Sequence, residues 1–349
     1  MQEERIALIS SCVPMIHGGY RFIVDWLEIK LRERGFAVET IYIPSTEEPH
    51  SLLSQMAAFQ MIELDRYFDR VITFRPPAHM VRHRRKVCWF IHHIRAFYDL
   101  WDEHQYHRMP DNAPYRALRD AVRQADTLAL GEAHRLFTNS KTVSGRLKAF
   151  NGLDSEVLYP PLFEPGLFRR GTFGDEIVSV CRLTAHKRQH LLVEAMRHTR
   201  TPVRLRLCGL SSDPIYYARL TDIVREHGLE DKVTIDHRWI SEEEKVQFLS
   251  ESLAAAYAPF DEDSYGYPVL EAAHAARPTL VLSDGGGVAE FVRDGQTGLV
   301  ADPTPEAIAV AFDRLFVDRR GTEAMGEAAE RNVAELGIDW DTVVARLTS

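Results

Sequence analysis

The chain has 349 residues, of which 45% are hydrophobic and 27% charged, and its net charge is −9 at pH 7. That length exceeds the usual size of a single core and predicts two domains. The acidic balance argues against general nucleic-acid binding. No apolar run reaches the roughly 18 residues of a membrane span, and the sequence opens with no signal-peptide pattern. Scattered cysteines in apolar, strand-like contexts predict buried, reduced thiols and a cytoplasmic protein: Cys12, Cys88, Cys181 and Cys208.

Short apolar, β-branched runs alternate with amphipathic stretches in both halves of the chain, a pattern typical of βαβ units and parallel sheets. The first half predicts a helix over 20–34. Strands are expected in the first half at 6–10, 38–43, 71–74, 87–91 and 136–138. Strands are expected in the second half at 177–180, 204–208, 233–235, 254–257 and 279–282. The fold class expected from this alternation is α/β.

The segment 159–174 is rich in Pro and Gly and has no periodicity, which is typical of a linker between domains. We therefore expect a first domain over 1–160 and a second over 161–336. Residues 337–349 follow the second alternation and carry a helical pattern around 339–346.

The segment 259–278 is the most informative part of the sequence. Asp263 and Glu271 are two carboxylates eight residues apart, separated by a turn and the apolar start of a helix. Gly266 allows backbone to approach a ligand closely, and Pro268 suits the first turn of a helix, where its missing N–H costs nothing. Two acids and a helix start would then converge on a ligand that carries both hydroxyls and phosphates.

Two cations follow the first strand of the second half. Arg182 stands at the strand end, and Lys187 is expected in the first turn of the helix that leads to His190. A guanidinium and an ammonium beside the N–H groups of a helix start would suit different oxygens of one diphosphate.

The first half offers two further candidates at strand ends. Gly18 and Gly19 follow the first strand and permit a tight turn beside a phosphate or sugar, but no G-x-G-x-x-G is present, so bound NAD is not expected. His92 and His93 follow the strand at 87–91, where ligands bind in α/β sheets. A helix cap or a packing role remains the alternative for either histidine.

The sequence Asp-Ser-Tyr-Gly-Tyr-Pro-Val-Leu-Glu at 263–271 resembles the carboxylate-x7-carboxylate motif of retaining glycosyltransferases of the bacterial group 1, glycogen-synthase-like family. Asp263 stands where that motif usually has Glu. Residues 180–187 resemble the family's Gly-Arg-Leu segment that is followed by a Lys, with Arg182 and Lys187 in register. The resemblance implies a GT-B fold, in which two Rossmann-like doubly wound domains face a central cleft and the terminal helix crosses back to the first domain. It also implies that the first domain binds the acceptor and the second the nucleotide sugar.

The resemblance further implies roles for individual residues. Arg182 and Lys187 would stabilise the departing nucleoside diphosphate, and Glu271 would bind ribose hydroxyls. Asp263 would hydrogen-bond the donor sugar, and His92, favoured over His93 by register, would position that sugar. Further donor contacts are expected from Gly18, Gly19, Gly209, Tyr265, Gly266, Tyr267 and Ile240.

Asp261 and Asp263 also form Asp-x-Asp, which holds a divalent metal in another glycosyltransferase fold. Because Arg182 and Lys187 can neutralise a diphosphate, we expect no metal and no cofactor. The expected partners are a UDP- or GDP-sugar and a glycan, lipid-linked or small-molecule acceptor, with no nucleic acid.

Three alternatives remain open. The chain could be a nucleotide-sugar epimerase or hydrolase of related fold, or a non-catalytic nucleotide-sugar binding protein. The basic run from Arg82 to Lys86 could be a solvated loop or a contact with anionic lipid headgroups, which would make the protein membrane-peripheral.

Overall fold

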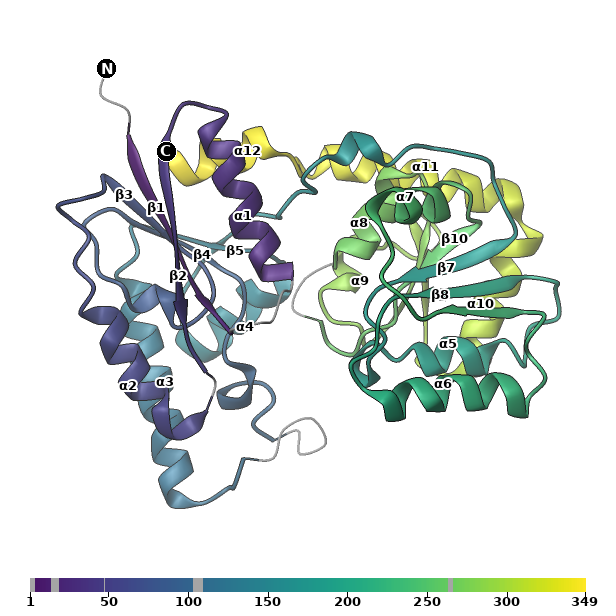
Figure 1. The fold of residues 1–349 in the computed structure, drawn as a ribbon, viewed down its shortest axis with the longest axis horizontal. Helices are drawn as coiled ribbons and strands as arrows, with labels where there is room; N and C mark the ends of the chain where they lie inside the picture. The colour runs from purple at the N-terminus through teal and green to yellow at the C-terminus, as the bar shows by residue number, and fades with distance from the viewer. Residues whose placement is uncertain (1–3, 14–18, 47, 103–108, 263–265) are drawn as a thin grey trace. The chain divides into compact units, whose positions relative to one another are not determined.

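Figure 1 shows a computed structural model of the chain, which describes residues 4–13, 19–46, 48–102, 109–262 and 266–349. The chain divides into two compact units, one formed by Met1–Pro161 with Ile338–Ser349 and the other by Leu162–Gly337. Among the described residues, each unit contains one six-stranded sheet flanked by helices. The predicted α/β class with two Rossmann-like parallel sheets is confirmed.

All strand pairs described in the first sheet are parallel. Every residue of its third and fourth strands is buried, as expected where helices cover both faces of a parallel sheet. The order across this sheet is β2 (Ala37–Pro44), β1 (Arg5–Cys12), β3 (Arg70–Thr73), β4 (Lys86–Phe90), β5 (Arg135–Thr138) and β6 (Glu156–Val157).

The helices of the first unit begin with clear local signals. Asn112 and Ser140 precede two of them and accept hydrogen bonds from the backbone N–H of Tyr115 and Val143, so both act as N-caps. The helices of this unit are α1 (Gly19–Arg32), α2 (Pro49–Gln60), α3 (Ala113–Gly131), α4 (Lys141–Asn151) and α12 (Trp340–Thr348), with 3₁₀ turns η1 (Ala78–Met80) and η2 (Arg95–Phe97).

The second sheet is also parallel in every described pair. Its order is β12 (Gly298–Ala301), β11 (Thr279–Leu282), β10 (Ala254–Ala256), β7 (Glu176–Val180), β8 (Arg204–Cys208) and β9 (Val233–Asp236). From β7 the chain adds β8 and then β9 on one side. It then crosses to the other side of β7 and adds β10, β11 and β12 there. That reversal is a topological switch point, outside which ligands bind at the carboxyl ends of the strands.

The helices of the second unit connect these strands. They are α5 (Gln189–Ala195), α6 (Pro214–Glu226), α7 (Glu242–Ser250), α8 (Tyr267–His274), α9 (Val288–Phe291), α10 (Pro305–Val317) and α11 (Arg319–Glu335), with 3₁₀ turns η3 (Pro165–Leu167) and η4 (Ala185–Lys187). Every strand expected from sequence is present in the two sheets, and β6 and β12 are additions. Both are short, and β6 pairs only with two residues of β5.

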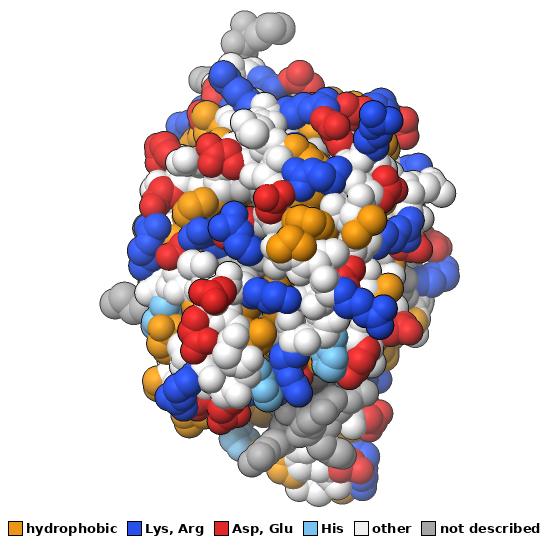
Figure 2. Space-filling model, turned by 90° about the vertical axis from the view of Figure 1, so that its right-hand side faces the viewer, with side chains coloured by type: hydrophobic (Ala, Val, Ile, Leu, Met, Phe, Trp, Pro, Cys, Tyr) orange, Lys and Arg blue, Asp and Glu red, His pale blue; other side chains and the backbone are white. Residues whose placement is uncertain are grey.

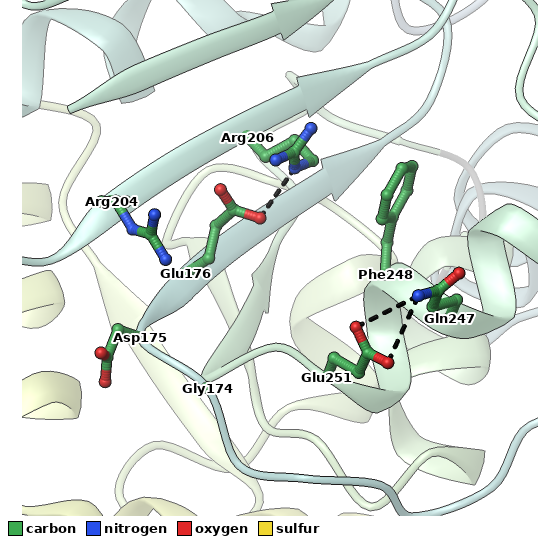
Figure 3. A pocket seen from close by; sticks show the side chains of 8 residues that line it. All are labelled: Gly174, Asp175, Glu176, Arg204, Arg206, Gln247, Phe248 and Glu251. Carbon is green, nitrogen blue, oxygen red and sulfur yellow. Dashed lines mark hydrogen bonds and ion pairs between the residues drawn. The ribbon is translucent and has the colours of Figure 1, made fainter. Parts of the chain in front are cut away.

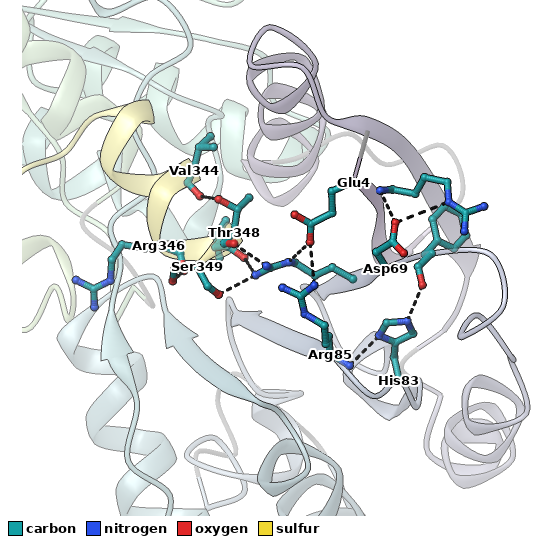
Figure 4. A network of polar contacts seen from close by, with 12 residues as sticks. Glu4, Asp69, His83, Arg85, Val344, Arg346, Thr348 and Ser349 are labelled. Atoms are coloured by element: carbon teal, nitrogen blue, oxygen red, sulfur yellow. Dashed lines mark hydrogen bonds and ion pairs between the residues drawn. The ribbon is translucent and has the colours of Figure 1, made fainter. Parts of the chain in front are cut away.

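Arginines at the amino edge of the first sheet donate hydrogen bonds to the last carbonyl oxygens of the terminal helix α12 (Figure 4). Arg70 is 2% exposed, and its guanidinium donates hydrogen bonds to the carbonyl oxygens of Leu347 at 2.8 Å and Thr348 at 2.5 Å. Arg135 donates to the carbonyl oxygen of Arg346 at 3.0 Å. The last carbonyls of a helix have no partner within it, so these contacts satisfy them.

Two expectations about side-chain exposure are wrong. Lys86 does not extend the exposed basic run, because it is the first residue of buried strand β4 and its Nζ donates to the carbonyl oxygens of His79 and Ala129 at 3.0 and 2.8 Å. Burial lowers the pKa of this lysine. All four cysteines lie in the described residues and are free thiols, but Cys12 and Cys181 are partly exposed at strand ends rather than buried.

Arg70→Met should destabilise the first unit by about 3 kcal/mol, because it leaves the terminal carbonyls of α12 without donors. Urea denaturation followed by tryptophan fluorescence would measure this, since most tryptophans of the chain lie in the first unit. Arg84→Met is the matched control at the same sheet edge; Arg84 is exposed, and its loss should change stability by about 0.5 kcal/mol or less. Equal effects of the two substitutions would contradict the capping role of Arg70.

Candidate active site

The candidate site lies at the carboxyl edge of the second sheet, beside the switch point between β7 and β10. Segments that follow three neighbouring strands meet there: 181–188 after β7, 257–262 after β10 and 283–287 after β11. Their backbones are joined by hydrogen bonds, from Phe260 N to His186 O at 3.1 Å and from Asp261 N to Asp284 O at 2.9 Å.

Lys187 is directed toward the segment that follows β10. Its Nζ donates a hydrogen bond to Tyr257 Oη at 2.6 Å and forms an ion pair with Glu262. Lys187 ends the 3₁₀ turn η4 rather than standing in the first turn of an α-helix, because Arg188 adopts a left-handed conformation with φ of 49° and separates the two.

At the start of α5, the N–H of His190 is already bonded within the second unit. It donates to Tyr216 Oη at 3.2 Å, and that hydroxyl in turn donates to Gln189 Oε1 at 3.1 Å.

Glu262 and Tyr257 complete a cluster around the Lys187 ammonium. Tyr257 Oη donates to Glu262 Oε2 at 3.2 Å, and His186 Nε2 lies 3.8 Å from the same oxygen. Burial opposes ionisation of Glu262, but the neighbouring His186 and the charge of Lys187 hold its pKa well below the usual range. Burial and the charge of Glu262 raise the pKa of Tyr257, which therefore stays a neutral phenol.

The glycine loop after β11 fixes the backbone that carries Glu262. Glu262 N donates to Gly285 O at 3.0 Å, and Gly287 N donates to Glu262 O at 2.7 Å. Gly286 has φ of 67°, and a Cβ there would lie 2.5 Å from Glu262 O, so this position requires glycine. The guanidinium of Arg188 forks onto Asp284 at 2.6 and 2.7 Å and ties the same loop to the segment after β7.

The helix of the carboxylate motif, α8, begins against Tyr257. Gly266 has φ of 73°, and a Cβ at this residue would lie 2.4 Å from Tyr257 Cε1, so only glycine fits. Glu271 is 7% exposed one turn further on, and Lys245 Nζ of α7 donates to its Oε1 at 2.6 Å. Burial raises the pKa of Glu271, and the charge of Lys245 opposes that rise. Burial and the charge of Glu271 raise the pKa of Tyr267 as well.

The remaining second-unit candidates are placed as follows. Arg182 is exposed beside the site, and Gly209 has φ of 142°, where a Cβ would lie 2.2 Å from the carbonyl oxygen of Cys181. Ile240 lies before α7, the helix that carries Lys245. Asp263, Tyr265 and Gly18 lie outside the described residues.

In the first unit, the two histidines that follow β4 differ in burial and in hydrogen-bond partners. His93 is 2% exposed and pairs with Asn151 Oδ1 at 2.9 Å, and burial lowers its pKa to about 4. His92 is half-buried, and its Nδ1–H donates to the carbonyl oxygen of His93 at 2.6 Å. The neutral His92 ring then carries its lone pair on Nε2. Gly19 is the first residue of α1.

A pocket of about 220 Å³ lies elsewhere on the second unit, between the amino halves of β7 and β8 and helix α7 (Figure 3). Arg206, one of its lining residues, is paired with Glu176 at 2.7 Å and with Asp236 at 2.8 Å. The face of the second unit in Figure 2 shows basic and acidic side chains interspersed, with hydrophobic ones scattered among them. Neither feature adds a residue to the carboxyl-edge site.

The segments that form this site lie within a region that matches a known protein family. Residues 173–332, which span the strands and loops of the site, match the model of Glycosyl transferases group 1. The second unit is a group 1 glycosyltransferase domain. Both resembled motifs of this domain, around Arg182 and Glu271, fall within the matched range.

Curated relatives are similar over part of their length. The chain is 32% identical over 125 residues to an alpha-1,3/1,6-mannosyltransferase of Dictyostelium discoideum, which covers 36% of this chain and 29% of that protein. It is 29% identical over 205 residues to a GDP-mannose-dependent alpha-(1-6)-phosphatidylinositol monomannoside mannosyltransferase of Mycobacterium tuberculosis, covering 56% of this chain and 53% of that protein. The chain thus matches about half or less of these relatives' length.

Solved structures share the fold over nearly the whole chain. Sucrose-phosphate synthase from Thermosynechococcus elongatus superposes with a TM-score of 0.77 at 18% identity, covering 99% of this chain and 98% of that one. An Anabaena protein solved with UDP and glucose has a TM-score of 0.71 at 16% identity, covering 98% of both chains. These likenesses confirm the GT-B fold. Among the described residues, no helix is long and apolar enough to cross a membrane.

Three site residues could not be identified from the sequence: Tyr257, Glu262 and Lys245. Tyr257 ends an apolar strand, and Lys245 stands in an acidic helix that has the composition of a solvated surface. Glu262 offered one signal, its position in a run of three acids in the segment that follows β10. Only the folded structure shows which of those acids meets Lys187.

Lys245→Met should destabilise the second unit by about 3 kcal/mol at pH 8, because it leaves Glu271 buried without its counter-charge. Burial then raises the Glu271 pKa further, so the folded unit retains a proton that the unfolded chain releases. The free energy of unfolding of the variant therefore falls as pH rises from 5 to 8. The loss of stability caused by Lys245→Met should be smaller at pH 5 than at pH 8. Urea denaturation followed by circular dichroism would measure both values.

The control for this prediction is the same substitution in a Glu271→Gln background. There the penalty of Lys245→Met should fall below about 1 kcal/mol and lose its dependence on pH, because no carboxylate remains to be stranded. A pH-independent penalty in both backgrounds would show that Lys245 acts through packing.

Proposed function

We propose that the protein is a retaining glycosyltransferase that moves a hexose from a nucleotide-diphosphate donor to a glycan, lipid-linked or small-molecule acceptor. One observation carries this proposal: Lys187 and the carboxylate helix of Glu271 meet around Tyr257 at the switch point of a group 1 glycosyltransferase domain. The second unit would hold the donor and the first unit the acceptor.

The donor side has the chemical groups that a nucleotide sugar needs. Arg182 and Lys187 are cations at the carboxyl edge, suited to oxygens of a diphosphate. Glu271 is a carboxylate paired with the Lys245 ammonium, suited to accept hydrogen bonds from ribose hydroxyls. A UDP- or GDP-hexose fits these features, and the relatives include a GDP-mannose-dependent enzyme. Gly209, Gly266, Tyr267 and Ile240 remain proposed donor contacts, as do Gly18, Gly19 and Tyr265.

In the proposed reaction, the acceptor hydroxyl attacks the anomeric carbon on the face from which the diphosphate departs. Arg182 and Lys187 would stabilise the negative charge that builds on the leaving group, a contribution that grows toward the transition state. Asp263 would accept hydrogen bonds from the donor sugar. His92 would position that sugar through Nε2, the ring nitrogen left free by its bond to the His93 carbonyl.

The first unit carries a second proposed contact, away from His92. Arg82, Arg84 and Arg85 are exposed at the amino edge of the first sheet, opposite the edge where His92 lies. We propose that they provide a peripheral contact with anionic headgroups, each cation contributing about 1 kcal/mol near such a surface. Lys86 plays no part in this contact, because it is buried.

A nucleotide-sugar hydrolase or epimerase would turn over its donor without any acceptor, and a binding protein would retain the donor unchanged. Incubation with a nucleotide sugar alone, followed by chromatography, separates these two outcomes from acceptor-dependent transfer.

Arg182→Ala and Lys187→Ala should each reduce transfer about 100-fold or more, because a lost donor to developing charge typically costs about 3–4 kcal/mol. Rates would be measured with the UDP-, GDP-, ADP- or TDP-sugar that most raises the melting temperature of the wild type. Arg197→Ala removes an exposed cation just beyond α5 and serves as the matched control. Rates within threefold of wild type for both site variants would refute the diphosphate assignment.

Transfer should persist in excess EDTA at a rate within about twofold of the untreated enzyme. The physical reason is that Arg182 and Lys187 supply positive charge where a metal ion would otherwise bridge the diphosphate. Transfer assays with EDTA, and with manganese added back, test this directly. Loss of activity in EDTA with recovery in manganese would favour a metal bound through Asp261 and Asp263.

A further inference from the structure

Lys187 already has an anionic partner before any ligand binds. Its side chain is 13% exposed and that of Glu262 is 21% exposed, so the pair is only weakly screened by water. Tyr257 connects the two by accepting from Lys187 and donating to Glu262. The charge of the Lys187 ammonium is therefore neutralised within the protein.

The position of Glu262 is set by the fold. Its backbone N–H and carbonyl are both hydrogen-bonded to the glycine loop, at Gly285 and Gly287. Displacement of the carboxylate from Lys187 therefore requires rotation of the Glu262 side chain and no change in these backbone bonds. His186 Nε2, 3.8 Å from Glu262 Oε2, offers the carboxylate a second polar neighbour once it leaves the ammonium.

We propose that Glu262 is an internal counter-ion of Lys187, which the diphosphate of the donor displaces on binding and which returns when the nucleoside diphosphate leaves. This inference rests on the proposed function, because it assigns the ligand of Lys187 to a diphosphate. It adds a positioning residue outside the resembled motifs, one residue before Asp263.

Displacement has a defined thermodynamic consequence. A ligand that needs the free ammonium binds more weakly when Glu262 is paired with it. Its apparent dissociation constant equals the intrinsic constant divided by the fraction of protein in which Lys187 is free. The same competition speeds release of the product nucleoside diphosphate, since Glu262 can recapture Lys187. A ligand without phosphates does not meet this competition.

Isothermal titration with UDP and GDP tests the inference directly. Glu262→Gln should tighten binding of whichever nucleoside diphosphate the wild type prefers by about fivefold or more, because it removes the competing charge and keeps the side-chain shape. Binding of the matching nucleoside, uridine or guanosine, should stay unchanged. In transfer assays the donor KM should fall, and inhibition by the product diphosphate should strengthen.

Two controls isolate the pair. In a Lys187→Ala background, Glu262→Gln should leave nucleoside diphosphate affinity unchanged, since the group for which they compete is absent. Asp261→Asn removes a charge from the neighbouring residue and should alter affinity by less than about twofold. Melting curves without ligand would show that all variants are folded.

The outcomes separate this inference from the proposed function. If the wild type binds UDP or GDP and Glu262→Gln weakens binding or leaves it unchanged, Glu262 is no competing counter-ion. Equal tightening by Asp261→Asn would assign the effect to general electrostatics and would also overturn the inference. If the wild type binds neither diphosphate, the proposed function fails, and this inference fails with it.

Discussion

The contact between the Lys187 ammonium, the Tyr257 hydroxyl and the Glu262 carboxylate depends on three loops that follow separate strands. Parallel strands bring their carboxyl ends to one edge, but the loops must also be held at hydrogen-bond distance. Backbone bonds between the segments after β10 and β11, and the fork of Arg188 onto Asp284, provide that constraint. The glycines at 266 and 286 are required because backbone and aromatic ring occupy the space of a side chain.

Two lysine–glutamate pairs in the second unit differ in what a ligand can do to them. Glu271 is the more deeply buried carboxylate, and the charge of Lys245 opposes the rise in its pKa that burial causes. In the other pair it is the cation, Lys187, that the proposed ligand needs, and Glu262 stands against it at a more exposed position. In the proposed function, the Lys245–Glu271 pair leaves a carboxylate for the ligand. The Lys187–Glu262 pair must break before the ammonium can bind an anion.

Much of the fold could be predicted because the strands of parallel sheets are buried on both faces and appear as continuous apolar runs. Gly266, Pro268 and Glu271 could also be placed, since turn and helix-start chemistry is local. Tertiary pairing is not local. Lys187 and Glu262 are 75 residues apart and Lys245 and Glu271 are 26 apart, so no spacing rule connects them. The pairing of Lys86 is not local either, because its carbonyl partners come from other elements.

The charge balance of the carboxyl edge bears on ligand selection. Arg188 is paired with Asp284, and Lys187 with Glu262, so much of the positive charge of the edge is balanced internally. A small anion such as inorganic phosphate gains little by replacing Glu262, because it exchanges one ion pair for another. Under the proposed function, a nucleoside diphosphate would bring ribose hydroxyls for Glu271 in addition, and that second contact would supply the free energy to break the first pair. In this arrangement the internal counter-ion favours ligands that engage both pairs at once.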